Sequence, residues 1–301
     1  MRRATKIKIL LALVIALFLG AYGRHRHLSR ETDITGTLEN KQMDEISGIA
    51  ASGVDSDVYY VHNDSGDTSR FFAITPQGKL LSTIYFKGDS KEVQGVHDCE
   101  DIAVGPGPDK KKSYIYLGDI GDNSSDRING ITIYRAEENS SWLTQAVSKT
   151  RMAPLHLKYP DGPRDAETLM IDPIEKLIYI VSKRRDSVTV YTAPLNYKAN
   201  DSVMLTKRCK LFFAGIKPLK WITAGDISKD GSQILLKNYE SVYYWKRKGN
   251  EPVWKTMQSK PGEPFYVSER QGEAIGFTPN GTGYYTTSEG IYSPIYYYKT
   301  P

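Results

Sequence analysis

Runs that favour helices are scarce in this chain of 301 residues, which argues against an α-rich fold. Tyrosine, by contrast, is abundant at 21 residues, and the chain has 25 glycines and 15 prolines. Aromatic side chains favour strands, and this supply of glycine and proline is enough for the turns of about twenty strands. The composition therefore predicts an all-β protein that is long enough to bury a core.

The folded part of the chain also lacks an excess of basic charge. The whole chain carries +5, but residues 1–30 hold seven basic residues and no acid. Without them, 33 basic residues face 35 acidic ones, a net charge of −2. Because no basic stripe or aromatic stacking platform is evident, nucleic acid is not expected as a partner.

No apolar run reaches the roughly 20 residues of a usual membrane span. The run Ile9–Gly23 has fifteen residues and lies between two basic clusters, which is the layout of a secretory signal. Cleavage within Ala21–Gly23 and retention as a tilted anchor, with Lys8 reaching the surface, both stay open. We expect residues 1–30 to be a signal peptide or an N-terminal membrane anchor. The rest should be exported, periplasmic or extracellular, and should meet a membrane only through this segment.

A polar opening followed by a short apolar strand recurs five times, at steps of 53, 67, 58 and 48 residues. Each opening is followed by further short strands bounded by Gly, Pro, Asp or Asn. A repeat of about 50 residues made of short strands indicates a β-propeller. The openings are Glu45-Ile-Ser-Gly-Ile, Asp98-Cys-Glu-Asp-Ile, Asp165-Ala-Glu-Thr-Leu, Thr223-Ala-Gly-Asp-Ile and Gln271-Gly-Glu-Ala-Ile.

The count predicts five four-stranded blades in one domain, residues 31–301, expected to be a monomer. The fifth repeat lacks its last strand, and residues 33–38 can supply it and close the ring, which removes an exposed edge. Val253–Lys255 is expected to be the last strand of the fourth repeat. Six blades are the alternative, if the long second repeat hides strands. Its surplus, Glu137–Arg151, is better explained as a short helix or loop.

The two cysteines, Cys99 and Cys209, fall at an inner and an outer strand, so a disulfide between them is not expected even after export. Catalysis by Cys99 is also disfavoured, although His97 and His62 could approach it in space.

The first strand of a propeller blade starts, and the second ends, at the same mouth of the channel. In this chain both ends are rich in carboxylates and amides, the oxygen ligands that Ca²⁺ prefers. Each acid could also simply cap a turn. The openings contribute Glu45, Asp98, Glu100, Asp101, Asp165, Glu167, Asp226 and Glu273, and the exits contribute His62, Asn63, Asp64, Asp119, Asp122, Asn123, Lys183, Arg184, Asn238, Ser288 and Glu289.

Several of these segments together resemble a group of exported bacterial propeller proteins without an assigned activity. More distantly they are similar to the β-propeller phytases and esterase-like phytase domains, in which acids at inner-strand starts bind calcium. The segments are Glu45-Ile-Ser-Gly-Ile with His62-Asn-Asp-Ser-Gly, Glu100-Asp-Ile-Ala-Val-Gly with Gly118-Asp-Ile-Gly-Asp-Asn, Asp165-Ala-Glu-Thr-Leu with Val181-Ser-Lys-Arg, and Gln271-Gly-Glu-Ala-Ile-Gly-Phe.

The resemblance implies that Glu100, Glu167 and Glu273 bind a calcium ion, with Asn63 and Asp119 as neighbours. The chain departs from the phytase pattern in three ways. It has five blades, and Gly225 stands where other repeats place Glu or Ser. Lys183 and Arg184 replace an acidic exit. These two cations belong to a solvated loop, offset the acids or hold an anionic ligand.

Three functions remain open on this sequence. The first is a module that binds an unidentified ligand or protein at the channel mouth, with Ca²⁺ as a possible cofactor. The second is a metal-dependent hydrolase of a phosphoester or lactone, in which the ion polarises the substrate or activates water. The third is a structural envelope protein whose acids only cap turns.

Overall fold

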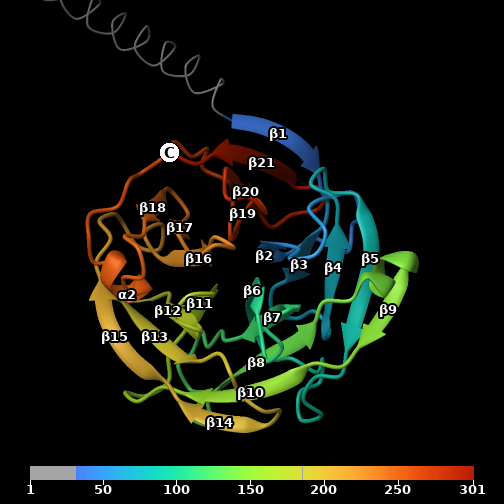
Figure 1. Cartoon of the computed structure of the whole chain (residues 1–301), viewed down its shortest axis with the longest axis horizontal. Coiled ribbons are helices and arrows are strands. Elements are labelled where there is room, and N and C mark those ends of the chain that lie inside the picture. Colours follow the sequence, from blue (N-terminus) through green and yellow to red (C-terminus); the bar gives the residue numbers. More distant parts are fainter. Residues whose placement is uncertain (1–31, 185) are drawn as a thin grey trace, which may run out of the picture.

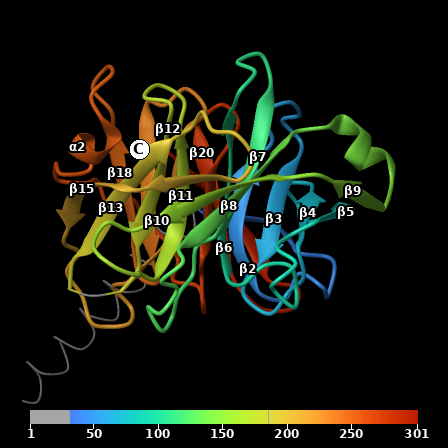
Figure 2. The ribbon, with the colours of Figure 1, turned by 90° about the horizontal axis from the view of Figure 1, so that it is seen from below.

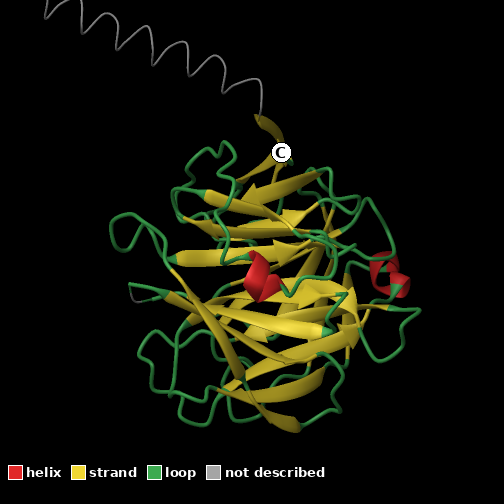
Figure 3. Cartoon of the chain, turned by 60° about the vertical axis from the view of Figure 1, so that its left-hand side comes forward, coloured by secondary structure: helices red, strands yellow, loops and turns green. Residues whose placement is uncertain are grey.

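The computed structural model describes residues 32–184 and 186–301, and the predicted leader, residues 1–30, lies outside them. Five small sheets are arranged in a ring (Figure 1), which confirms the five-bladed propeller over the six-bladed alternative. Strands dominate the described residues, and the helices among them are short (Figure 3). No helix in this part of the chain is long and apolar enough to cross a membrane.

The blades follow one another along the chain, and each begins with its innermost strand. Blade 1 consists of β2 (Ile46–Ala51), β3 (Tyr59–Asn63), β4 (Arg70–Ile74) and β5 (Leu80–Phe86); blade 2 of β6 (Cys99–Pro106), β7 (Ser113–Asp119), β8 (Ile131–Glu137) and β10 (Ala153–Lys158); blade 3 of β11 (Ala166–Asp172), β12 (Leu177–Ser182), β13 (Val188–Pro194) and β15 (Thr206–Leu211); blade 4 of β16 (Ile222–Ile227), β17 (Gln233–Asn238) and β18 (Val242–Lys246); blade 5 of β19 (Ala274–Phe277), β20 (Gly283–Thr287), β21 (Pro294–Lys299) and β1 (Thr32–Thr37).

The five innermost strands contact one another in a closed ring, in the order β2, β6, β11, β16 and β19. Figure 2 shows the blades from the side, with their strands running between the two faces of the ring. Each innermost strand is antiparallel to the second strand of its blade. The starts of the first strands and the ends of the second strands therefore meet at one mouth of the channel.

Strand β1 closes the ring, as predicted, by pairing antiparallel with β21 from Thr32↔Tyr298 to Thr37↔Pro294. It also contacts blade 1, because the Thr37 N–H donates to the Gln77 carbonyl at 3.1 Å. Gly36 permits this approach, since a Cβ there would lie 1.9 Å from that same carbonyl oxygen. The first described strand thus joins the last blade to the first.

Two extra strands pair in parallel with the outer edges of blades 1 and 2. β9 (Val147–Thr150) pairs with β5, and β14 (Asp201–Met204) pairs with β10. The surplus segment Glu137–Arg151 therefore holds a 3₁₀ helix, η1 (Ser140–Thr144), as expected, and also a strand that the sequence reasoning missed. Each of these new edge strands has four residues, and short edge strands limit pairing with other chains.

In the described part of the chain, blade 4 has no regular fourth strand, and the strand predicted at Val253–Lys255 is wrong. That segment begins the helix α2 (Val253–Thr256), which follows Pro252 and packs near blade 3, where the Cys209 thiol lies 3.5 Å from the Trp254 carbonyl. Among the residues that the structure describes, the edge of β18 meets one bridging residue, Gly262. Pro261 and Pro264 flank that residue, and proline cannot donate to a strand ladder.

An apolar cluster fills each of the five junctions between neighbouring blades. Between blades 1 and 2, for example, the Phe71 ring lies edge-on to Tyr60 at 5.8 Å and to Trp142 of η1 at 5.7 Å. Full burial of one such large side chain contributes about 1.5–3 kcal/mol. Since each blade buries its faces against two others, the ring and the channel are stabilised together.

Two buried aspartates link the innermost strands of neighbouring blades. Asp101 accepts the backbone N–H of Leu169 at 2.9 Å, and Asp226 accepts that of Phe277 at 2.7 Å. Both occupy the fourth position of their repeat's opening. The sequence analysis grouped them with the acids of the channel mouth, whereas the structure shows them linking one blade to the next.

Candidate cation site at the acidic mouth

Seven carboxylates gather where the innermost strands begin, and this end of the channel is named the acidic mouth. They form three groups, within each of which the ligand atoms all lie within 4.8 Å of one another. The groups are Asp64, Asp98 and Glu100; Asp64, Glu273 and Glu289; and Glu100, Asp165 and Glu167. The strand starts of blades 2, 3 and 5 supply five of these acids, and the exits of β3 and β20 supply Asp64 and Glu289.

Glu100 belongs to two of the three groups and is the most deeply placed of their shared members. Its side chain is 2% exposed, and its Oε2 atom has no hydrogen-bond partner among the described residues. Gly121 leaves room for it, because a Cβ there would lie 2.3 Å from both Glu100 Oε1 and Asp98 Oδ2. Burial, and then the charges of Glu167 and Asp64, raise the pKa of Glu100 well above its usual value.

Lys183 occupies the side of the mouth that blades 3 and 5 share. Its ammonium forms an ion pair with Glu167 and lies 3.5 Å from Glu273 Oε1, which also accepts the Tyr239 hydroxyl. Burial alone would lower the pKa of Lys183, but the two carboxylates raise it above its ordinary value. The lysine therefore stays charged and takes the position that a cation would hold between these glutamates.

Arg184 neutralises a further carboxylate at the rim of the mouth. Its guanidinium donates to Asp165 and to the Asn123 side chain, and its Cζ lies 4.8 Å from the ring centroid of Trp221. Asp165 also accepts the backbone N–H of Asp122 at 3.0 Å. The polar atoms of Asp165 are thus largely occupied by protein groups.

Asn63 and Asp119 hold loops beside the site through their own polar atoms. The Asn63 amide donates to the Gln42 carbonyl at 2.7 Å. The Asp119 carboxylate pairs with Arg127 Nη1 at 2.8 Å and accepts the backbone N–H of Asp98 at 3.2 Å. The structure therefore places both residues next to the acids, as positioning groups for the surrounding chain.

Asp64, Asp98 and Glu100 form the part of the mouth that has no basic partner among residues 32–184 and 186–301. These three are named the acid trio. Asp98 is 5% exposed, and its Oδ1 finds no donor in the described part of the chain. Burial is the main reason that the pKa of Asp64 rises to about 7 and that of Asp98 to about 6. Crowded, desolvated carboxylates of this kind are stabilised by a hard cation.

A cavity of about 200 Å³ opens at Asp98, the member of the acid trio that lines it. It is lined by Asp98 together with residues of the two neighbouring loops, and the other lining residues are Ser65, His97, Asp122, Asn123, Ser124 and Asp126. An ion on the trio could therefore keep water or an external ligand in its remaining coordination positions.

Cys99 and His62, the disfavoured nucleophile and its possible base, are both buried in this structure. Burial raises the pKa of the Cys99 thiol well above its usual value, and thiolate is the reactive form. Burial lowers the pKa of His62 to about 4, and its Nδ1 lies 2.8 Å from the Asn63 carbonyl. The geometry of the acidic mouth favours ion binding over nucleophilic catalysis.

The sequence predicted Glu100, Glu167 and Glu273, at the third position of their openings, as site residues. It did not predict a ligand role for Asp64 or Asp98. Asp98 was noted as one opening residue among many, although its position two residues before Glu100 puts both carboxylates in the trio. Tyr239 and Trp221, which contact Lys183 and Arg184, were not anticipated. Trp221 directly precedes β16 and Tyr239 directly follows β17, positions at which the other repeats place mostly polar residues.

A comparison with models of protein families found no match, and a comparison with curated proteins also found none. The function is therefore argued from the geometry and chemistry of the site.

Proposed function

We propose that the protein is an exported binding module whose acidic mouth binds a divalent cation, with Ca²⁺ as the preferred ion. The observation that carries this proposal is the buried, unpartnered Oε2 of Glu100, within an acid trio that has no basic partner among the described residues. A buried charged group without compensation is costly, so a site of this kind is built for a charge that the chain itself does not provide.

Calcium suits the trio better than magnesium does. Ca²⁺ accepts six to eight oxygen ligands in irregular geometry, while Mg²⁺ demands a near-octahedral shell and retains its waters. Asp64, Asp98 and Glu100 offer several carboxylate oxygens from two blades, and the adjoining cavity leaves room for water. Open coordination positions facing that cavity would hold an anionic group of a ligand or partner.

Lys183 divides the predicted metal ligands into two sets. Glu167 and Glu273 are already compensated by its ammonium, so we assign them to the surroundings of the ion. Glu100 keeps the role of ligand, and Asp64 and Asp98 join it. Arg184 is bound to Asp165 in this structure, and an anionic ligand would have to compete with that ion pair.

Calcium-dependent stability of the full-length chain tests the proposal. An ion that binds only the folded state stabilises it by about 2.7 kcal/mol at a concentration one hundred times its Kd. The melting temperature should therefore rise with Ca²⁺, rise less with Mg²⁺, and return to its starting value with chelator.

The variant Glu100→Gln keeps the size of the side chain and loses its charge. It should melt at a higher temperature than the wild type in chelator, because the cost of burying an ionisable carboxyl is gone, and should respond little to Ca²⁺. Glu263→Gln, at an exposed acid on the outer side of blade 4, is the matched control and should respond like the wild type. A calcium response that is equal in both variants would refute the role of Glu100.

A further inference from the structure

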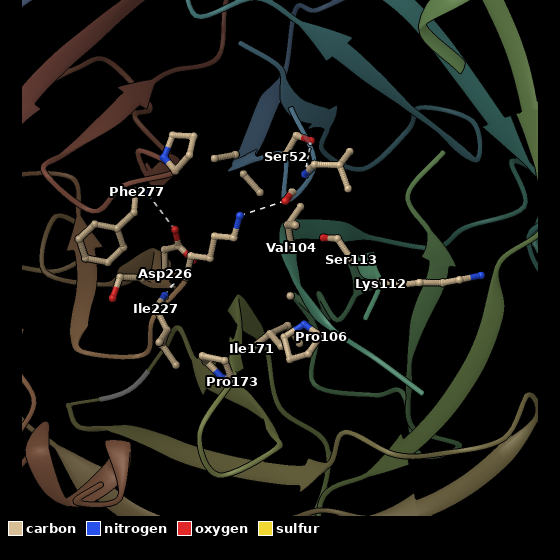
Figure 4. A pocket seen from close by; sticks show the side chains of 18 of the residues that line it. Ser52, Val104, Pro106, Lys112, Ser113, Ile171, Pro173, Asp226, Ile227 and Phe277 are labelled. Atoms are coloured by element: carbon tan, nitrogen blue, oxygen red, sulfur yellow. Dashed lines mark hydrogen bonds between the residues drawn. The ribbon is translucent and has the colours of Figure 1, made fainter. Parts of the chain in front are cut away.

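The opposite mouth of the channel, where the innermost strands end, holds a cavity of about 320 Å³ (Figure 4). Its wall is mostly apolar and includes residues from all five innermost strands or the turns that follow them. These include Ala50, Val104, Pro106, Ile171, Ile227 and Phe277. This volume falls within the range of about 300–1,000 Å³ that is typical of small-molecule sites.

The rim of this cavity is strongly basic, and we name this end of the channel, where the innermost strands end, the lysine mouth. Five lysines line it: Lys110, Lys111, Lys112, Lys176 and Lys229. The acid among the lining residues is Asp226, whose two oxygens accept the backbone N–H groups of Ile227 and Phe277. Burial raises the pKa of Asp226 to about 7, which weakens its negative charge near neutral pH. The mouth therefore carries a net positive charge.

Lys229 reaches across the mouth from the end of blade 4 to blade 1. Its ammonium donates to the Gly53 carbonyl at 3.0 Å, a neutral acceptor. An ammonium has three N–H donors, so this contact leaves donors for a ligand. In the described part of the chain, Lys229 forms no ion pair, whereas Lys112 pairs with Glu137 at 2.8 Å.

The acceptor of this lysine is itself held in place. The Gly53 N–H donates to Glu138 Oε2 at 2.9 Å, and the Ser52 hydroxyl donates to the other oxygen of the same carboxylate. Gly53 must lack a side chain, because a Cβ would lie 2.1 Å from the Ser113 hydroxyl oxygen. The ammonium is thus positioned over the apolar cavity by a rigid turn, which limits the entropy cost of binding.

We propose that the lysine mouth binds a small organic anion with an apolar body. Its carboxylate would contact Lys229 and the neighbouring rim lysines, and its body would fill the cavity against Val104, Ile171 and Phe277. A charge-assisted hydrogen bond to the ammonium supplies orientation, and burial of the apolar body supplies affinity. The site lies at the other end of the channel from the acid trio and does not depend on the cation proposed there.

Calorimetric titration of the full-length chain with three probes separates the two contributions. The anion 3-phenylpropanoate should bind with one site per chain. Acetate, which has the charge without the body, should bind at least about tenfold more weakly. The cation 3-phenylpropylammonium, which has the body with the opposite charge, should give no binding heat. Equal binding of the anion and the cation, or no binding of 3-phenylpropanoate, would overturn the proposal.

Variants place the site on the protein. Lys229→Met keeps the length of the side chain and should weaken 3-phenylpropanoate by about tenfold, as expected for one hydrogen bond to a charged group. Lys229→Arg should restore most of the affinity. Lys299→Met, at an exposed lysine outside the cavity, should bind as the wild type does. Unchanged affinity in Lys229→Met would contradict the assignment.

Discussion

The two mouths of the channel are made from the two ends of the same five strands, yet they carry opposite charge. At the acidic mouth the charges come from strand starts and recur along the chain, as Glu100, Glu167 and Glu273 do. At the lysine mouth they come from the hairpin loops beyond β6, β11 and β16, which differ in length and sequence. Equivalent positions in successive repeats thus bring like charges together at the acidic mouth, whereas the hairpin loops determine the charge of the lysine mouth.

Burial separates the mouths further. Glu100 and Glu167 are each 2% exposed, whereas the rim lysines are exposed. Buried like charges must be compensated, either by Lys183 or by an added cation. Exposed lysines are hydrated and need no partner, so they remain available to a ligand.

The largest effect is expected from a deletion that unfolds the ring and so destroys both mouths. Deleting residues 32–37 takes away β1, the strand that closes the ring on β21. Since the five blade junctions stabilise one another, the loss should be comparable to the whole stability of a domain, about 5–15 kcal/mol. Circular dichroism should show no cooperative melt. The control Ile34→Thr changes an exposed side chain of the same strand and should stay within about 0.5 kcal/mol of the wild type. A cooperative melt of the deletion variant would show that closure is dispensable.

A smaller loss of stability is expected when the buried lysine of the acidic mouth is replaced, in contrast to the exposed lysines of the other mouth. Lys183→Met leaves Glu167 and Glu273 buried without their cation, which should cost about 3 kcal/mol in chelator. Ca²⁺ should recover more stability in this variant than in the wild type, because a second group of acids becomes free to bind it. Urea denaturation with and without Ca²⁺ measures both quantities.

Lys112→Met is the matched control for that experiment. Lys112 pairs with Glu137 at the lysine mouth, in water, where ion pairs contribute little. Its denaturation midpoint should equal that of the wild type. If Lys183→Met behaved the same way, the acids of the mouth would not need compensation.

A further effect is the dependence of stability on pH. The pKa values of Asp98 and Asp64 rise on folding to about 6 and about 7, so the folded state holds these protons more tightly than the unfolded chain does. The stability that these two groups contribute in chelator is therefore fully present below pH 4 and is lost as the pH rises through 6 and 7. Saturating Ca²⁺ should flatten this part of the profile. A chelated protein that gained stability between pH 4 and 7 would contradict the account.

Much of the fold could be predicted because the same pattern of short strands recurs five times in the sequence. The five openings located β2, β6, β11, β16 and β19, and the missing last strand identified β1. The fourth blade broke the pattern for a local reason, since Pro252 starts a helix and Pro261 and Pro264 prevent a ladder. β9 was missed because its partner β5 lies about sixty residues away in the sequence.

The site was less predictable because its balance of charge depends on contacts between blades. Repeat position indicated that Glu100, Glu167 and Glu273 share one region. It could not indicate that Lys183 would reach two of them and leave the third to Asp64 and Asp98. The outcome depends on side-chain reach across the channel, which no single repeat encodes.

A crystal structure from crystals grown with Ca²⁺ tests most directly the central claim that the acid trio binds this ion. The account predicts an ion between the carboxylates of Asp64, Asp98 and Glu100, with calcium–oxygen distances of about 2.3–2.6 Å. Lys183 should remain on Glu167 and Glu273. An empty trio at saturating Ca²⁺, with the ion bound elsewhere or not at all, would contradict it.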